Sequence, residues 1–303
     1  LAMIANSYNT AIGSGALEDA NGSEAYNVAI GNDSMTNVDN DASDYCVAIG
    51  HNALNGGTGT VANSIAIGAF ALDGTGSLGG SQNIAIGYES MSGTVTTDYP
   101  FWNVAIGHQA MSAGAMNACV GNVVIGYQSG KQITTGDYNA FYGHQTGDAI
   151  TTGSNNIALG YQALSVATDT SNTVCIGYQA GDAINDTGAN GTVAIGYEAS
   201  TALTSGANQV SIGYQAGKAL TTSGNSVFIG HQAGLTHTGA NNVAIGDRAF
   251  SNTDADANSL ASDKNVAIGN LAMGGAINNT VTRAVAVGYY ALGAATCGTS
   301  ASY

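Results

Sequence analysis

Short apolar triplets recur along the whole chain and alternate with longer polar stretches. Each triplet precedes a glycine, and its first and third residues are mostly Val or Ile, whereas its middle residue is mostly Ala. β-Branched residues two positions apart share one face of a strand. We therefore predict one short strand per triplet, with the first and third residues in the interior and the middle residue facing outward. The core expected from this pattern includes Val28, Ile30, Val104, Ile106, Val193, Ile195, Val210, Ile212, Val243 and Ile245.

The triplets repeat with a short and nearly fixed period. The glycines that follow them are 13, 31, 50, 68, 87, 107, 126, 143, 160, 177, 196, 213, 230, 246, 269 and 288, which are 16 to 23 residues apart. Such a period is typical of stacked repeats that bury apolar surface against their neighbours. The sequence predicts an all-β fold: residues 1–303 form a single parallel β-solenoid, or β-roll, of about 16 rungs. Each rung is expected to hold two short strands, the second at pairs such as Ala53-Leu54, Ala110-Met111 and Ala291-Leu292.

Asparagine recurs one or two places before most triplets. Asn tolerates a left-handed backbone and hydrogen-bonds to its copy in a neighbouring rung. We therefore expect an asparagine ladder at a corner of the solenoid. Its members are Asn27, Asn63, Asn83, Asn103, Asn122, Asn156, Asn172, Asn208, Asn225, Asn242 and Asn265.

The balance of charge argues against several partners. The formal net charge is −15, and only five residues are Lys or Arg. Nucleic acids and anionic membranes are bound mainly through basic side chains, so we expect neither as a partner. No apolar run reaches the length needed to cross a bilayer.

The position after the glycine carries an aromatic residue in most repeats. Tyr occupies it at Tyr88, Tyr127, Tyr161, Tyr178, Tyr197, Tyr214 and Tyr289, and His at His51, His108, His144 and His231. We interpret this set as an exposed aromatic column and as a candidate surface for a ligand. Three symmetry-related histidines of a trimer are an alternative, as a Zn²⁺ or Ni²⁺ site. The repeats show no recurrent carboxylate partner for such a site.

Other candidate chemistry is sparse. Two acidic clusters, Asp39, Asp41 and Asp44, and Asp254, Asp256 and Asp263, are interpreted as solvated loops, with Ca²⁺ as the alternative. Cys46, Cys119, Cys175 and Cys297 lie in separate repeats, too far apart for intrachain disulfides. No nucleophile elbow, phosphate loop or repeated pair of catalytic carboxylates occurs. We therefore predict no catalytic residues, no cofactor and no metal, and a protein that is not an enzyme.

The repeat has a recognisable longer form, Asn-x-Val-Ala-Ile-Gly-Tyr-Gln-Ala-Gly. Residues 172–181, 208–217 and 225–234 follow it, apart from their middle residues Cys175, Ser211 and Phe228. This phrase resembles the head repeats of trimeric autotransporter adhesins and the repeats of phage tail fibres. The resemblance covers residues 9–292 and implies a left-handed β-roll, a homotrimer and an extracellular location on a virion appendage or a cell surface.

Several functions follow from these features. The main hypothesis is a structural segment of a surface-exposed fibre, which we expect to be part of a longer chain or a filament subunit, with binding of a host receptor as an added role. The alternative is a cell-surface adhesin or an extracellular filament subunit that binds glycans. Ice binding and degradation of polysaccharides are further readings, with less support from the residues. In all the fibre readings the chain is expected to form homo-oligomers, as trimers or as end-to-end filaments.

Overall fold

The computed structural model describes residues 8–18, 24–38, 43–56, 59–74, 80–95, 100–251, 262–275 and 281–293. The chain divides into a first unit, Leu1–Asn155, and a second unit, Asn156–Tyr303. The first unit holds strands β1 (Thr10–Ile12), β2 (Val28–Ile30), β3 (Val47–Ile49), β4 (Ile65–Ile67), β5 (Ile84–Ile86), β6 (Val104–Ile106), β7 (Val123–Ile125) and β8 (Ala140–Tyr142). The second holds β9 (Ile157–Leu159), β10 (Val174–Ile176), β11 (Val193–Ile195), β12 (Val210–Ile212), β13 (Val227–Ile229), β14 (Val243–Ile245), β15 (Val266–Ile268) and β16 (Val285–Val287).

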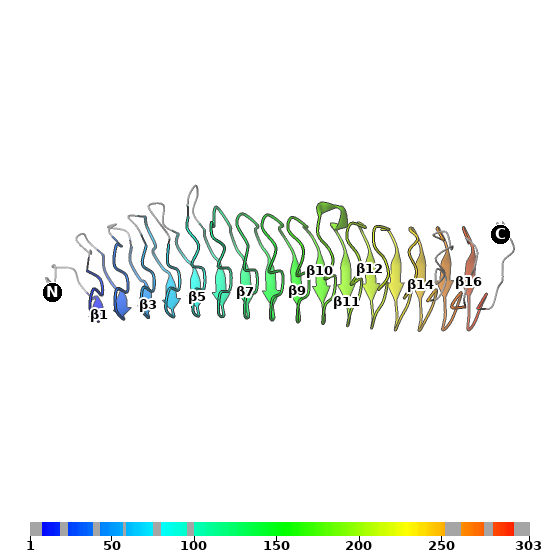
Figure 1. The fold of residues 1–303 in the computed structure, drawn as a ribbon, viewed down its shortest axis with the longest axis horizontal. Coiled ribbons are helices and arrows are strands. Elements are labelled where there is room, and N and C mark those ends of the chain that lie inside the picture. The colour runs from blue at the N-terminus through cyan, green and yellow to red at the C-terminus, as the bar shows by residue number, and fades with distance from the viewer. Residues whose placement is uncertain are drawn as a thin grey trace. The chain divides into compact units, whose positions relative to one another are not determined.

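In each unit the strands pair in parallel and in register, one strand per repeat. Val193 of β11 lies opposite Val210 of β12, and Ile195 opposite Ile212. Each strand is followed by a turn and a loop that leads to the next strand, so that the chain climbs one rung per repeat (Figure 1). The predicted all-β parallel solenoid is confirmed. Within the described residues the one helix is the 3₁₀ turn η1 (Thr187–Ala189), and no helix there is long and apolar enough to cross a membrane.

The glycine after each strand makes a bend that other residues would resist. Gly196 has φ of +137°, and a Cβ added there would collide with the carbonyl of Gly213 in the next rung. The backbones of neighbouring rungs therefore approach each other as closely as glycine permits. This contact and the positive φ explain the glycine at this position; at Gly288 only the positive φ, +127°, applies.

The expected facing of the strand residues is wrong. The middle residue of β11, Ala194, is fully buried, whereas Val193 and Ile195 on either side are only partly buried. The same pattern holds for every residue that was expected in the core: Val28, Ile30, Val104, Ile106, Val193, Ile195, Val210, Ile212 and Val243 are partly buried, and Ile245 is 36% exposed. The interior is thin, so most strands supply a small side chain to it and the flanking β-branched residues lie outside; Val124, Phe141 and Phe228 are larger middle residues that are also fully buried.

The wall opposite the strands supplies the rest of the core, but not as the second strand that we expected. Ala53 and Leu54 are consecutive and both fully buried. Successive residues of a strand point to opposite faces; here a positive φ of 52° at Leu54 turns both side chains inward. Ala110 and Met111 repeat this geometry. The prediction of inward side chains is thus confirmed for these pairs, while the prediction of a strand is wrong. In the third predicted pair, Ala291-Leu292, the side chain of Leu292 is 42% exposed and does not point into the core.

The large buried side chain of this wall stands at one of two positions, which differs from rung to rung. Five described rungs have glycine four residues after the bend, at 130, 147, 181, 217 and 234, and a large side chain three residues later, at Ile133, Ile150, Ile184, Leu220 and His237. All five large side chains are fully buried. In the rung of Leu164 the earlier position is large and the later one, Ala167, is small, and both are fully buried. In these six rungs the bulk therefore lies at one of the two positions or at the other.

The asparagine ladder is confirmed and is buried. In the first unit Asn103, Asn122 and Asn139 each donate from Nδ2 to Oδ1 of the preceding asparagine, over 3.2, 3.1 and 3.0 Å. The same oxygens also accept the backbone N–H of the next asparagine. The asparagines one place further upstream, including Asn63, Asn172, Asn208 and Asn225, have a left-handed backbone, and Asn208 donates to Oδ1 of Asn225 over 3.3 Å. The asparagine directly before the strand and the asparagine one place further upstream, which we had treated as one position, therefore have distinct roles.

Candidate functional site

The second unit carries a column of stacked tyrosines. Tyr161, Tyr178, Tyr197 and Tyr214 each follow the bend glycine of their rung, and successive ring centroids lie 5.2, 5.1 and 5.1 Å apart. Their planes differ by only 8° to 10°. His231 continues the stack at 5.4 Å from Tyr214. Because the rungs are in register, one ring is added per rung, and the predicted aromatic column is confirmed here.

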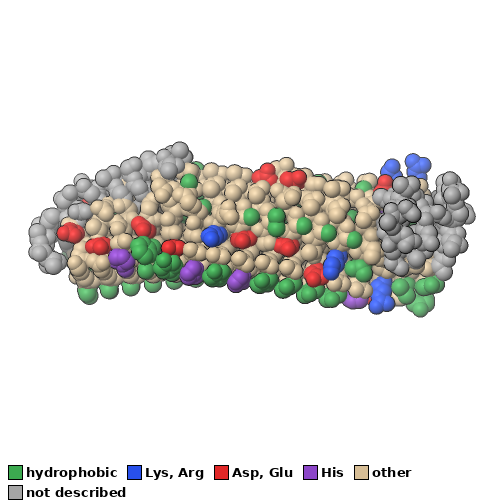
Figure 2. Space-filling view, in the orientation of Figure 1, with side chains coloured by type: hydrophobic (Ala, Val, Ile, Leu, Met, Phe, Trp, Pro, Cys, Tyr) green, Lys and Arg blue, Asp and Glu red, His purple; other side chains and the backbone are tan. Residues whose placement is uncertain are grey.

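The first unit has a mixed column at the same position. Tyr88, His108, Tyr127 and His144 stack at centroid distances of 5.1, 5.3 and 4.8 Å. Phe70 lies between His51 and Tyr88 and contacts both rings edge to face. Tyr289 of the second unit contacts only the neighbouring Tyr290 among the ring contacts of the described residues. Hydrophobic side chains with histidines among them follow one edge of each unit in the space-filling view (Figure 2).

The stacking decides what the column offers to a ligand. Both faces of the Tyr178 ring are covered, one by Tyr161 and one by Tyr197. A sugar ring therefore cannot stack on a tyrosine face inside the column. The ring edges and the hydroxyl groups remain, and the four tyrosines are 42% to 45% exposed. The column presents a row of hydroxyl groups with the period of the rungs.

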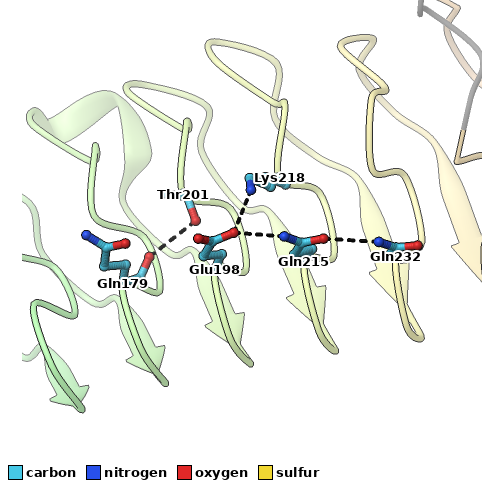
Figure 3. A network of polar contacts seen from close by, with 6 residues as sticks. All are labelled: Gln179, Glu198, Thr201, Gln215, Lys218 and Gln232. Carbon is cyan, nitrogen blue, oxygen red and sulfur yellow. Dashed lines mark hydrogen bonds and ion pairs between the residues drawn. The ribbon is translucent and has the colours of Figure 1, made fainter.

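A row of side-chain amides runs beside the tyrosines. Gln179 donates to Oε1 of Gln162 over 3.3 Å, and Gln232 donates to Oε1 of Gln215 over 3.1 Å. Gln215 in turn donates to Glu198 over 2.8 Å, and Lys218 contacts the same carboxylate (Figure 3). The four glutamines and Glu198 have a left-handed backbone with φ between 50° and 54°. The first unit repeats the arrangement from Glu89 through Gln109 and Gln128 to Gln145.

Glu89 and Glu198 are the acidic side chains of these rows. Hydrogen bonds from Lys218 and Gln215 lower the pKa of Glu198, and a hydrogen bond from Gln109 lowers the pKa of Glu89. The glutamates act on the adjacent tyrosines in turn: the charge of Glu198 raises the pKa of Tyr197, and a hydrogen bond with Glu89, followed by its charge, raises the pKa of Tyr88.

The outer face of each sheet forms a second candidate surface. It consists of the first and third residues of the strands, which are the Val and Ile rows described above. Most of these side chains are partly buried, and Ile157 and Leu159 of β9 are 46% and 47% exposed. The strand residues from β2 to β8 and from β9 to β16 carry no charge. This outer Val/Ile face is apolar and β-branched, as is usual for a sheet face that packs against another layer.

The structure gives little support to a metal site within one chain. Among the described residues no group of three His, Cys, Asp or Glu side chains is placed to hold an ion. Asp44 and Asp263 accept hydrogen bonds from the backbone N–H groups of Ala25 and Ala240 in the preceding rungs. Asp39, Asp41, Asp254 and Asp256, which completed the acidic clusters, lie outside the described residues.

The described cysteines are buried and unpaired. Cys46, Cys119 and Cys175 are free thiols, as expected, and Cys297 lies outside the described residues. Burial raises the pKa of Cys46 to about 11 and the pKa values of Cys119 and Cys175 to about 12. A thiol with such a pKa is a poor nucleophile at neutral pH, so these groups serve as small core side chains.

Sequence reasoning missed two features of this surface. One is the outer Val/Ile face, because the larger apolar residues were assigned to the core. The other is the amide row, which a recurrent Gln two places after the glycine signals on its own. A scan against models of known protein families found no match, and a search of curated proteins found none either.

Proposed function

We propose that this protein is a structural segment of an extracellular fibre, phage or cellular, that assembles as a homo-oligomer and has no catalytic role. The observation that carries the proposal is the outer Val/Ile face, which is repeated on most strands and is only partly buried in the single chain. Burial of this face on another copy removes apolar surface from water at roughly 25 cal/mol per Å². The thin interior, lined largely by alanine, supplies less burial of its own.

The resemblance to autotransporter heads and tail fibres supports the same role and suggests three copies. In-register rungs favour this packing, since the same contact is repeated at every level of the stack. Binding of a receptor or of a surface glycan is the second part of the proposal. The tyrosine column and the amide row support it, because they present hydrogen-bonding groups at regular intervals beside the apolar face.

Sedimentation analysis tests the assembly. The wild-type chain is expected to sediment as an oligomer. A double variant, Ile195→Glu with Ile212→Glu, places charge on the outer face and is expected to sediment as a folded monomer. Thr152→Glu with Thr222→Glu adds the same charge at exposed turns and serves as the control. A monomeric wild type, or a double variant that sediments like the wild type, would overturn the proposal.

A further inference from the structure

The exposed strip between Tyr161 and Gln232 has two kinds of hydrogen-bonding group in every rung. Four rungs supply a tyrosine hydroxyl and the fifth supplies the ring of His231, and the next residue in each rung is Gln or Glu. An amide nitrogen carries two hydrogens, and the ladder bond of Gln179 uses one of them, as do those of Gln215 and Gln232 (Figure 3). The second hydrogen of each amide is available to a ligand. The strip therefore repeats a donor and acceptor pattern from rung to rung.

The period of this strip restricts the ligand. Ring centroids advance by 5.1 to 5.2 Å per rung from Tyr161 to Tyr214. The chain of an extended β-1,4-linked hexopyranose advances by one pyranose ring and one glycosidic oxygen per sugar, which is close to this spacing. A chain of α-1,4-linked sugars coils and loses register after a few units. A linear β-linked chain can thus keep one sugar per rung along the column.

The charges on the strip restrict the ligand further. The Lys beside it, Lys218, is bound to Glu198 at 2.5 Å, and Arg248 lies one rung beyond Gln232, outside the strip. Within the strip a polyanionic glycan would meet Glu198 beside a Lys that is already paired. Because the ring faces are covered, the ligand must also be recognised through its hydroxyl groups rather than by stacking.

We propose that the strip binds a neutral, extended β-1,4-linked hexopyranose chain that runs parallel to the tyrosine column, with one sugar per rung. The tyrosine hydroxyls and the outward amide hydrogens contact the equatorial hydroxyl groups of the sugars. Successive sugars of such a chain are turned over, so every second rung meets the same sugar edge. The inference rests on the adhesive part of the proposed function and names its ligand class.

Isothermal titration of the full chain with cellohexaose tests this ligand class. Cellotriose tests the dependence on length, and maltohexaose tests the linkage. The variant Tyr178→Phe with Tyr197→Phe and Tyr214→Phe removes three hydroxyls and keeps the stack. Tyr26→Phe with Tyr45→Phe is the control, since these first-unit tyrosines are also stacked, at 4.9 Å, and exposed.

Cellohexaose is expected to bind more tightly than either other sugar by about tenfold or more, because neutral hydrogen bonds add with each sugar in register. The triple variant is expected to lose about tenfold in affinity, with unchanged mass and melting temperature, while the control keeps its affinity. No binding of cellohexaose, equal binding of maltohexaose, or an unaffected triple variant would overturn the inference. These outcomes are separate from the assembly test, since a monomeric wild type that binds cellohexaose contradicts the oligomer and leaves the glycan site standing.

Discussion

Gln215 donates a hydrogen bond from Nε2 to Oε2 of Glu198 over 2.8 Å, which places a carboxylate as the first, N-terminal member of a row of amides. Every amide in the row donates toward the N-terminal neighbour, so the first member needs only to accept. A carboxylate accepts and does not donate. Glu89 has the same place in the first unit, where Gln109 donates to it over 2.7 Å. Glutamate therefore replaces glutamine where a row begins.

Acid is expected to weaken this arrangement. The folded pKa of Glu198 lies below its usual value of 4.5, because Lys218 and Gln215 bind the ionised form. Its contribution to stability is thus present above about pH 4.5 and is lost as the pH falls through the folded pKa. We expect Glu198→Gln to cost at most about 1 kcal/mol at pH 7 and to flatten the acid side of the melting-temperature profile. Glu18→Gln, at an exposed turn, is the control; identical acid profiles for Glu198→Gln and the wild type would contradict the assignment.

The exchange of bulk inside the rungs makes a second prediction. A Cβ added at Gly181 would meet Cys175 Sγ at 2.5 Å and Ile184 Cδ1 at 2.9 Å, so Gly181→Leu should overpack the core and destabilise by about 1–3 kcal/mol. Adding Ile184→Ala to Gly181→Leu should restore the part of this loss that comes from Ile184. The double variant has the residues of Leu164 and Ala167, both fully buried, at these two positions, and Leu164 has a φ of 56°, close to the 60° of Gly181. Chemical denaturation of the three variants measures the coupling; additive losses would show that the two positions do not share one space.

The fold was largely predictable from the sequence, and the facing of its strands was not. The repeated glycine and the alternating triplet indicate parallel rungs in register, because both depend on local geometry. Which face of a three-residue strand lies inside depends instead on the thickness of the interior. The rule that larger apolar residues go inward fails here, since Ala194 is buried and Ile195 is partly exposed. The presence of Phe141 and Phe228 at the middle position was the available clue: both are fully buried beside a glycine of the opposite wall, Gly147 and Gly234.

The candidate surface was predictable in position and less so in chemistry. A residue type that recurs at one offset from the glycine must form a column, and Tyr161 to Tyr214 do so. The ring orientation is set by packing between neighbouring rungs, which the sequence does not specify. The amide row follows from the same offset argument for Gln, but its direction depends on backbone geometry near Gln215 and Gln232.

A test of the strand facing compares two neighbouring residues of β11. Ala194→Asp buries a carboxylate in the core between Cys175 and Ser211 of the adjacent strands, and we expect a loss of more than about 3 kcal/mol or failure to fold. Ile195→Asp lies on the outer face and is expected to remain folded, with a change in assembly. Circular dichroism and thermal melting distinguish the two. Equal destabilisation of a monomeric form by both variants would contradict the assignment of the faces.

Alkaline conditions are expected to expose the buried thiols. The folded pKa of Cys175 is about 12, against 9.0 for a solvated thiol, because burial disfavours the thiolate. Its contribution to stability is therefore complete below about pH 9 and is lost as the pH rises toward 12. Cys175→Ala matches the buried Ala158 and Ala194 of the neighbouring strands and should reduce the alkaline loss of stability at a cost of about 1 kcal/mol or less at pH 7.

Alkylation checks the same thiols. With iodoacetamide at pH 8, peptide mass spectrometry of the native protein is expected to find Cys46, Cys119 and Cys175 unmodified, and all three modified after denaturation. Rapid labelling of Cys175 in the native state would show that its rung opens readily. It would also contradict the burial on which the alkaline prediction depends.

The buried asparagine ladder gives the last prediction. Asn122 donates to Asn103 Oδ1 and to the carbonyl of Gly136, over 3.1 and 2.8 Å, and its own Oδ1 accepts from the backbone and side chain of Asn139. Asn122→Leu would leave these buried groups without partners, so we expect a loss of about 2–5 kcal/mol. Asn122→Ser keeps a small hydrogen-bonding group, like Ser64, whose hydroxyl accepts the backbone N–H of Asn83 over 3.3 Å, and is expected to lose about half as much. Hydrogen exchange should show the opening confined to the rungs around Asn122 if the ladder acts locally. Equal stability of the Leu and Ser variants would mean that packing at this corner, rather than the amide ladder, holds the rungs together.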